Sequence, residues 1–155
     1  ASFVGVAPAR DPAGFMLPVA GRIVAEFGPR PNGQSNTGIT ITAPRGSPVR
    51  AADAGVVAYA GDEIRGFGRL LLLRHADGYV TAYAHNDRLL VAPGDVVARG
   101  QVIATVGTSG GAASPQLHFE IRQGSRPIDP RHMLAGEGAP VPPIGAAQDG
   151  RLNPG

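Results

Sequence analysis

The stretch Gln116-Leu-His-Phe-Glu-Ile-Arg122 alternates polar and apolar residues without a break. Because successive side chains of a β-strand point to opposite faces of a sheet, this stretch predicts a strand with one apolar and one polar face. The polar face carries Gln116, His118, Glu120 and Arg122. We therefore expect residues 117–122 to form a half-buried strand whose polar side chains carry the chemistry of the molecule.

Short apolar runs separated by turn residues extend this pattern outward along the chain. They predict further β-strands over residues 21–27, 39–42, 49–52, 55–60, 69–74, 79–84 and 102–106. The four consecutive leucines over residues 70–73 are typical of a strand that is covered on both faces. The pattern predicts a mainly β fold, an antiparallel β-sandwich with a central groove and little helix.

Length and composition agree with one turn-rich β domain. The chain has 155 residues and a mass of 15.8 kDa, with 23 glycines, 15 prolines and 5% aromatic residues. We expect a linker or weakly ordered segment over residues 1–16, the domain over 17–134 and a Gly/Pro-rich tail over 135–155. Because the chain begins at Ala1 without an initiator Met, we also expect it to be a segment of a longer protein.

Two absent residue types exclude several classes of chemistry. All 14 basic residues are arginines, so the chain has no lysine for a P-loop, a Schiff base or a biotinyl or lipoyl attachment. It has no cysteine, which excludes thiol nucleophiles, disulfides and iron–sulfur clusters. The net charge is only +2, and the arginines are spread along the chain, so nucleic-acid binding is not predicted.

A weak internal echo runs through the predicted domain. Gly46-Ser-Pro-Val49, followed by Val56-Val-Ala58, is similar to Gly94-Asp-Val-Val97, followed by Val102-Ile-Ala104. Either two related hairpin units pack against each other, or the similarity reflects shared glycine-rich turn chemistry.

The candidates for catalysis or metal binding are the histidines His75, His85, His118 and His132. We interpret His75 and His132 as structural, because a lone histidine more often forms hydrogen bonds than binds a metal. His85 lies in Tyr83-Ala-His-Asn86, where a period of two places Tyr83 and His85 on one face. This polar row and the row around His118 are predicted to meet in a shared groove.

The spacing of these residues gives little support for a hydrolase. A zinc hydrolase needs about three protein ligands and an open position for water. His85, His118 and Glu120 form a conceivable set, but the chain contains no His-x-His, His-x-x-x-Asp or His-Glu-x-x-His spacing. Gly107-Thr-Ser-Gly-Gly111 lacks a nucleophile-elbow pattern, so we interpret it as a flexible loop.

Several spaced motifs together resemble a known family. They are residues 15–28, Asn36-Thr-Gly-Ile-Thr40, residues 46–55, Arg65-Gly-Phe-Gly68, Tyr83-Ala-His-Asn86, residues 94–107 and Gln116-Leu-His-Phe-Glu-Ile-Arg122. In this order they resemble the LytM domain of lysostaphin-type zinc metallopeptidases over residues 15–134. The resemblance implies the β-sandwich and groove of that family.

The chain departs from this family at the zinc ligands. Active members hold zinc with the His and Asp of a His-x-Gly-Ile-Asp motif and with the second His of a His-x-His motif. The matching positions here are Asn36, Thr40 and His118, and Gln116 replaces the first His of the pair. The resemblance therefore implies that two ligands are missing, and we expect no cofactor, no tightly bound zinc and no peptidase activity. The alternative is an enzyme that recruits His75 or Glu120 as a substitute ligand.

Degenerate LytM domains are similar to the NlpD, EnvC and DipM group of bacterial cell-division factors, which bind and activate peptidoglycan hydrolases at the septum. This resemblance implies a location in the periplasm and a partner such as an N-acetylmuramoyl-L-alanine amidase. From the charge and composition we expect no contact with nucleic acid, and none with membrane from this segment. Two alternatives stay open: a residual zinc endopeptidase that cuts peptidoglycan peptides, and a plain peptidoglycan-binding module.

In that group the former active-site groove docks the partner. We expect Tyr83 and Arg122 to be the anchors, because aromatic residues and Arg dominate the energetics of interfaces. An alternative for Arg122 is a salt bridge with Glu120 at the rim of the groove. The remaining groove residues are expected to be Asn36, Thr40, Arg65, His85, Asn86, Gln116 and His118.

Overall fold

The computed structural model describes residues 7–29, 31 and 33–135. Residues 1–6 of the expected linker and residues 136–155 of the expected tail lie outside the described residues. The strands are β1 (Arg22–Ala25), β2 (Gly28–Pro29), β3 (Ser35–Asn36), β4 (Ile39–Thr42), β5 (Pro48–Arg50), β6 (Gly55–Gly61), β7 (Arg69–Arg74), β8 (Tyr79–Leu89), β9 (Val96–Val97), β10 (Val102–Val106), β11 (Gln116–Gln123) and β12 (Arg126–Ile128). Two 3₁₀ helices, η1 (Ala76–Gly78) and η2 (Pro130–His132), complete the elements of the described part.

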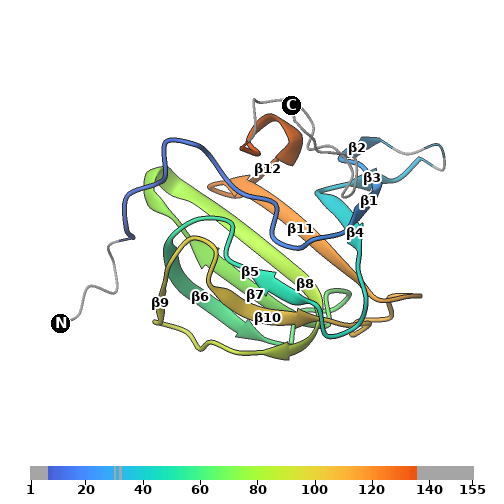
Figure 1. The fold of residues 1–155 in the computed structure, drawn as a ribbon. Coiled ribbons are helices and arrows are strands. Elements are labelled where there is room, and N and C mark those ends of the chain that lie inside the picture. The colour runs from blue at the N-terminus through green and yellow to red at the C-terminus, as the bar shows by residue number, and fades with distance from the viewer. Residues whose placement is uncertain (1–6, 30, 32, 136–155) are drawn as a thin grey trace.

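Most strands belong to one curved antiparallel sheet with the order β1-β4-β11-β8-β7-β6-β9 (Figure 1). β5 pairs with β10, and β10 pairs with the end of β8, so the sheet curls over and closes on a core. The expected mainly β, antiparallel fold class is confirmed. No helix in the described part of the chain is long and apolar enough to cross a membrane.

The predicted strands lie close to the observed ones. Residues 39–42, 69–74 and 102–106 are β4, β7 and β10 with unchanged bounds. β8 continues five residues beyond the predicted end at residue 84, to Leu89, because its second half pairs with β10. The very short β2, β3, β9 and β12 have too few residues to show a period, and the sequence did not predict them.

The internal echo corresponds to two interlocked units. β5 and β6, from the first copy, pair with β10 and β9 from the second. The turns before the two copies have the same hydrogen bond, from Ser47 N–H to Pro44 O and from Asp95 N–H to Ala92 O, at 3.0 Å in both. Each copy therefore completes the sheet of the other, which favours the interpretation of two related units over shared turn chemistry alone.

The sheet is covered on both faces, as the leucine run predicts. The main core lies on one face and includes Leu71 and Leu73, both fully buried, with the apolar residues of β11. Leu70 lies on the opposite face, where it packs with Ala82 and Ala84 in a smaller cluster.

The main core extends N-terminal to residue 17, where we expected the domain to begin. Phe15 is fully buried, and its backbone pairs with Leu134 in an isolated bridge. The Arg10 guanidinium lies over the rings of Phe15 and Tyr79, 4.6 and 4.5 Å from their centroids. We call residues 7–16 the N-terminal strap, because these contacts fasten them across the end of the core.

Candidate functional site

The polar face of β11 is organised around the buried carboxylate of Glu120. Thr37 Oγ1 donates a hydrogen bond to Glu120 Oε2 at 2.6 Å, and His118 Nε2 donates to the same oxygen at 2.7 Å. Arg122 Nε donates to the other oxygen, Oε1, at 2.7 Å. The residue is only 1% exposed, so its charge is balanced by these side chains and not by water.

These contacts keep Glu120 ionised. Burial by itself raises the pKa of this carboxyl group, but the hydrogen bonds from His118, Thr37 and Arg122 outweigh it and lower the pKa to about 2. The side chains of His118 and Arg122 are 14% and 30% exposed, so the network extends from the buried carboxylate to the surface, where the sequence predicts the groove.

A close backbone contact brings Thr37 to this network. Gly38 lies against β11, and a Cβ atom at Gly38 would lie 2.1 Å from the carbonyl oxygen of Phe119. Only glycine fits there without moving the backbone, so Gly38 allows the segment before β4 to approach Glu120. Sequence reasoning missed Thr37, although the Asn36-Thr-Gly-Ile-Thr40 motif contains it.

His85 reaches the groove through an unusual backbone conformation. Its φ is 70°, in the left-handed region that few non-glycine residues adopt. His118 pairs with Ala84 and Phe119 with Tyr83, so ordinary alternation would turn His85 toward the core beside Tyr83. Instead, the rings of His85 and His118 lie side by side with their centroids 6.4 Å apart. The predicted meeting of the two histidines is thus observed, but for a different reason.

His85 is held by two loops. Its ring Nδ1 donates to Ser109 O at 2.7 Å, and its backbone N–H donates to Phe67 O at 2.9 Å. Burial lowers the pKa of His85; the bond to Ser109 opposes this, and the nearby His118 adds to it. His85 is therefore favoured as a neutral imidazole.

Three further residues of the predicted groove come from β3, β4 and the start of β11. Thr40 lies directly opposite His118 on β4, half-buried. Gln116 begins β11 opposite Thr42 and forms an isolated bridge with Gly107. Asn36, on β3, accepts a hydrogen bond from Gly38 N–H with its side-chain oxygen.

Two expected groove residues do not line the surface. Tyr83 is fully buried and packs on Phe119, and its hydroxyl accepts from Ala52 N–H at 3.0 Å. Asn86 is also fully buried, and its side-chain nitrogen donates to the carbonyl oxygens of Arg69 and Tyr83. Tyr83 therefore cannot be a partner-contacting anchor in this conformation. Tyr83 lies opposite Phe119 in the register of β8 and β11, so ordinary alternation turns its ring to the core face of the sheet, away from His118.

The two expected arginines occupy different parts of the site. Arg122 pairs with Glu120, as in the salt-bridge alternative, and also donates from Nη1 to Ser125 O at 3.2 Å. It keeps part of its guanidinium at the surface, so this pairing does not remove it from the groove. Arg65 is exposed on the loop between β6 and β7.

The other two histidines lie outside this arrangement. His75 is buried, its Nδ1 donates to Ala54 O, and its Nε2 accepts from the Thr81 hydroxyl. Desolvation lowers the pKa of His75, although the Ala54 bond and the charge of Asp53 oppose it. His132 is exposed at the end of η2, 3.9 Å from Asp129.

The residues present do not fit a catalytic zinc ion. The side-chain oxygen of Asn36 is used by Gly38, Thr40 offers a neutral hydroxyl, and Nε2 of His118 is bonded to Glu120. The suggested substitutes do not help, because both ring nitrogens of His75 and both oxygens of Glu120 are occupied by protein groups. Recruitment of His75 is thus ruled out in this conformation. Within the described residues, no group of three or more His, Cys, Asp or Glu is placed to hold a metal.

Comparisons with known proteins agree with this fold. The sequence profile of peptidase family M23 matches residues 34–130. The chain is 44% identical to the uncharacterized lipoprotein YgeR of Escherichia coli over 81% of this chain and 49% of that protein. It is 43% identical to the cell division protein DipM of Caulobacter vibrioides, over 77% of this chain and 21% of that protein. It is 41% identical to the murein hydrolase activator NlpD of Escherichia coli, over 76% of this chain and 30% of that protein.

Solved structures give the same result. A zinc-containing peptidase from Vibrio cholerae is similar with a TM-score of 0.68 and 35% identity, over 75% of this chain and 39% of that one. The catalytic domain of lysostaphin from Staphylococcus simulans has a TM-score of 0.66 and 30% identity, over 71% of this chain and 89% of that one. The chain spans about half or less of the length of the three curated relatives.

Proposed function

The chain belongs to peptidase family M23, and we propose that it acts within this family without catalysis, as a regulator that binds and activates peptidoglycan hydrolases. The observation that carries this proposal is that side chains of the predicted groove form hydrogen bonds within the protein and are not arranged to bind a metal. At the positions where the family resemblance implies zinc ligands, Asn36 and His118 bond to the protein, and Thr40 is a weak ligand. Relatives named as a murein hydrolase activator and a cell division protein support the same function.

The groove has properties that suit the binding of a partner segment. Its buried carboxylate is already neutralised by neighbouring side chains, so docking a partner there leaves no unpaired buried charge. His118 and Arg122 remain partly exposed and offer a ring face and a guanidinium. Arginine is enriched among the residues that contribute most to binding at interfaces. The predicted set of groove residues is retained in this proposal except for direct contact by Tyr83 and Asn86.

We further propose that the partner is a periplasmic N-acetylmuramoyl-L-alanine amidase and that this domain acts in the periplasm. The family resemblance is the basis for the choice of an amidase. Relatives that are named as lipoproteins support a location in the cell envelope.

Release of dye from labelled sacculi tests the function. We would assay the domain alone, a periplasmic amidase alone and the two together. We expect release only in the mixture. Release by the domain alone would overturn the proposal in favour of an endopeptidase. Co-sedimentation of the domain with sacculi, without any change in amidase activity, would instead establish a peptidoglycan-binding module.

A further inference from the structure

A hollow of about 370 Å³ lies beside the groove, between the loop that joins β6 to β7 and the loop that joins β10 to β11. Its lining consists of Asp62, Ile64, Arg65, Gly66, Gly68, Arg69, Ser109 and Gly110. A second hollow of about 340 Å³ adjoins it, because Asp62 and Arg69 line both. We call the first of these the arginine hollow.

The wall of the arginine hollow is fixed by close backbone packing. Gly68 and Gly110 both have positive φ, and a Cβ atom on Gly110 would lie 2.4 Å from Gly68 N. Ser109 Oγ accepts from Arg69 N–H at 2.9 Å and donates to Asn86 O at 2.6 Å. Tyr59 closes the far end of the loop, because its hydroxyl accepts from Glu63 N–H at 3.0 Å. The two loops therefore hold each other in place.

The same two loops form one side of the groove. Ser109 O accepts from the ring of His85, and Phe67 O accepts from the His85 backbone. The Phe67 ring lies 6.2 Å from the His118 ring, centroid to centroid. The loops that line the arginine hollow therefore also contact His85 and His118, so we expect one extended ligand to reach both.

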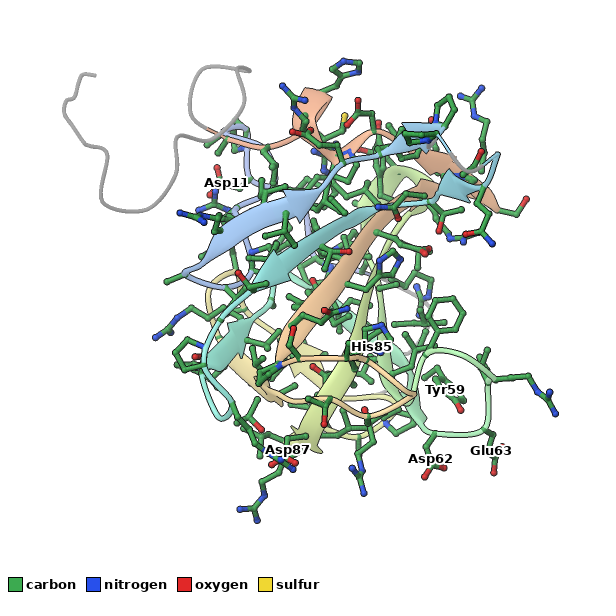
Figure 2. The ribbon with its side chains drawn as sticks, turned by 90° about the vertical axis from the view of Figure 1, so that its right-hand side faces the viewer. Asp11, Tyr59, Asp62, Glu63, His85 and Asp87 are labelled. Carbon is green, nitrogen blue, oxygen red and sulfur yellow. The ribbon has the colours of Figure 1, made fainter. Side chains whose placement is uncertain are left out.

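Two arginines line the hollow without a neutralising partner among the described residues. Arg65 and Arg69 are exposed, and within the described residues their guanidinium groups have no ion pair or hydrogen bond, unlike those of Arg45 and Arg122. Asp62 is the one acidic residue of the lining, and it makes no salt bridge with either arginine among the described residues. Figure 2 shows Asp62 and Glu63 pointing out of the loop, away from His85.

We propose that the arginine hollow binds a carboxylate side chain of an acidic protein segment that lies in the groove. This inference rests on the proposed function, because it assigns a chemical feature to the partner that occupies the groove. Guanidinium groups bind carboxylates through paired charge-assisted hydrogen bonds, and the fixed loops position them without a large loss of chain freedom. Arg65 and Arg69 would then select a partner with an acidic residue at the matching position.

A small probe tests the site without any partner. We would titrate the ¹⁵N-labelled chain with N-acetyl-L-glutamate and with its neutral isostere N-acetyl-L-glutamine. We expect glutamate to shift the amide signals of Gly66, Gly68 and Gly110, and glutamine to leave them in place. Equal shifts from both probes, or glutamate shifts spread over unrelated arginines, would overturn the proposal.

Charge variants sharpen this titration. Arg65→Gln combined with Arg69→Gln should weaken the response to glutamate at least about tenfold, and Asp62→Asn should strengthen it by removing a repelling charge. Arg126→Gln, at an exposed arginine of β12, is the matched control and should change nothing. An unchanged response in the double variant would show that the hollow is not the site.

The amidase assay separates this inference from the proposed function. If the function is right and the hollow binds the partner, the double variant lowers activation at least about tenfold and Arg126→Gln does not. Full activation by the double variant would overturn the inference and leave the function intact. Failure of the wild type to activate, with the glutamate response retained, would contradict the function alone. If the variant loses activation but sacculi without amidase compete for the glutamate response, the carboxylates bound are those of peptidoglycan, which overturns the assignment to a protein segment.

Discussion

Asp53 and Glu120 are both buried carboxylates, each 1% exposed and each paired with an arginine, but they lie in different regions and have different kinds of partners. Asp53 accepts backbone hydrogen bonds from Asp11 and Ala54 and lies 3.6 Å from Arg10. It therefore fastens the N-terminal strap to the core.

Glu120 is bonded by side chains instead, and these side chains face the groove. A carboxylate held by backbone groups fixes the path of the chain, whereas one held by side chains fixes the shape and charge of a surface. Similar burial therefore fastens the strap to the core in one region and, under the proposed function, prepares a binding surface in the other. Changes in the strap should affect stability alone, and changes around Glu120 should affect stability and partner binding.

The largest expected effect is in the strap, where Phe15→Ala removes a fully buried ring. Truncation of a buried Phe costs about 3–5 kcal/mol, so we expect a loss of this size in the free energy of unfolding measured with urea. Val24→Ala, at a side chain that is 52% exposed, is the control and should stay within about 0.5 kcal/mol of wild type. A loss below about 1 kcal/mol for Phe15→Ala would mean that the strap is not part of the cooperative fold.

Glu120→Gln should have the next largest effect on stability, and it should also reach the groove. The amide cannot accept the three hydrogen bonds as a charged group does, so we expect a loss of about 2 kcal/mol in the free energy of unfolding. Partner activation should fall as well, because His118 and Arg122 lose their common acceptor. Asp53→Asn is the matched variant: it should destabilise the chain but, at a temperature where it is folded, activate normally. Equal losses of activation in both variants would show that the residues around Glu120 have no role in activation beyond stability.

The pH dependence of stability should follow from the same carboxylate. The pKa of Glu120 is about 2 in the folded chain and near its ordinary value of 4.5 in the unfolded chain. Because the folded pKa is the lower one, the stabilisation is fully present above about pH 4.5 and is lost as the pH falls through about 2. The difference in free energy of unfolding between wild type and Glu120→Gln should therefore shrink from pH 6 to pH 3. A difference that stays constant over this range would contradict the assignment.

The sequence predicts the residues around Glu120 better than it predicts the N-terminal strap. Strict alternation in β11 is visible in the sequence, and this pattern alone places Glu120, His118 and Arg122 on one face. The position of His85 depends on its own left-handed backbone conformation, which no periodicity reveals. Because a period of two places Tyr83 and His85 on the same face, the sequence also did not indicate that Tyr83 is fully buried. The strap depends on contacts between residues far apart in sequence.

The contribution of Thr37 shows the same limit. Its hydroxyl reaches Glu120 across 83 residues of sequence, and only because Gly38 lies against the Phe119 carbonyl. A glycine in a recognisable motif indicates a tight approach, but it does not identify the strand that is approached. Patterns within one strand are therefore predictable, whereas contacts between strands depend on the three-dimensional fold.

The smallest expected effect on stability comes from Arg122→Ala, which separates folding from binding most cleanly. Its own side chain is 30% exposed, and Thr37 and His118 still donate to Glu120 in this variant. Because the carboxylate is buried and loses a charge-assisted bond, we expect a loss of about 1.5 kcal/mol and a thermal midpoint within about 6 °C of wild type. Binding to the periplasmic amidase, measured by titration calorimetry, should weaken at least about tenfold, because truncation of an anchor residue costs about 1.4 kcal/mol or more of binding free energy. Arg126→Ala, at an exposed arginine four positions away, should change neither quantity. If binding by Arg122→Ala is unchanged while its fold is intact, the network around Glu120 serves stability only, and the interface lies outside the groove.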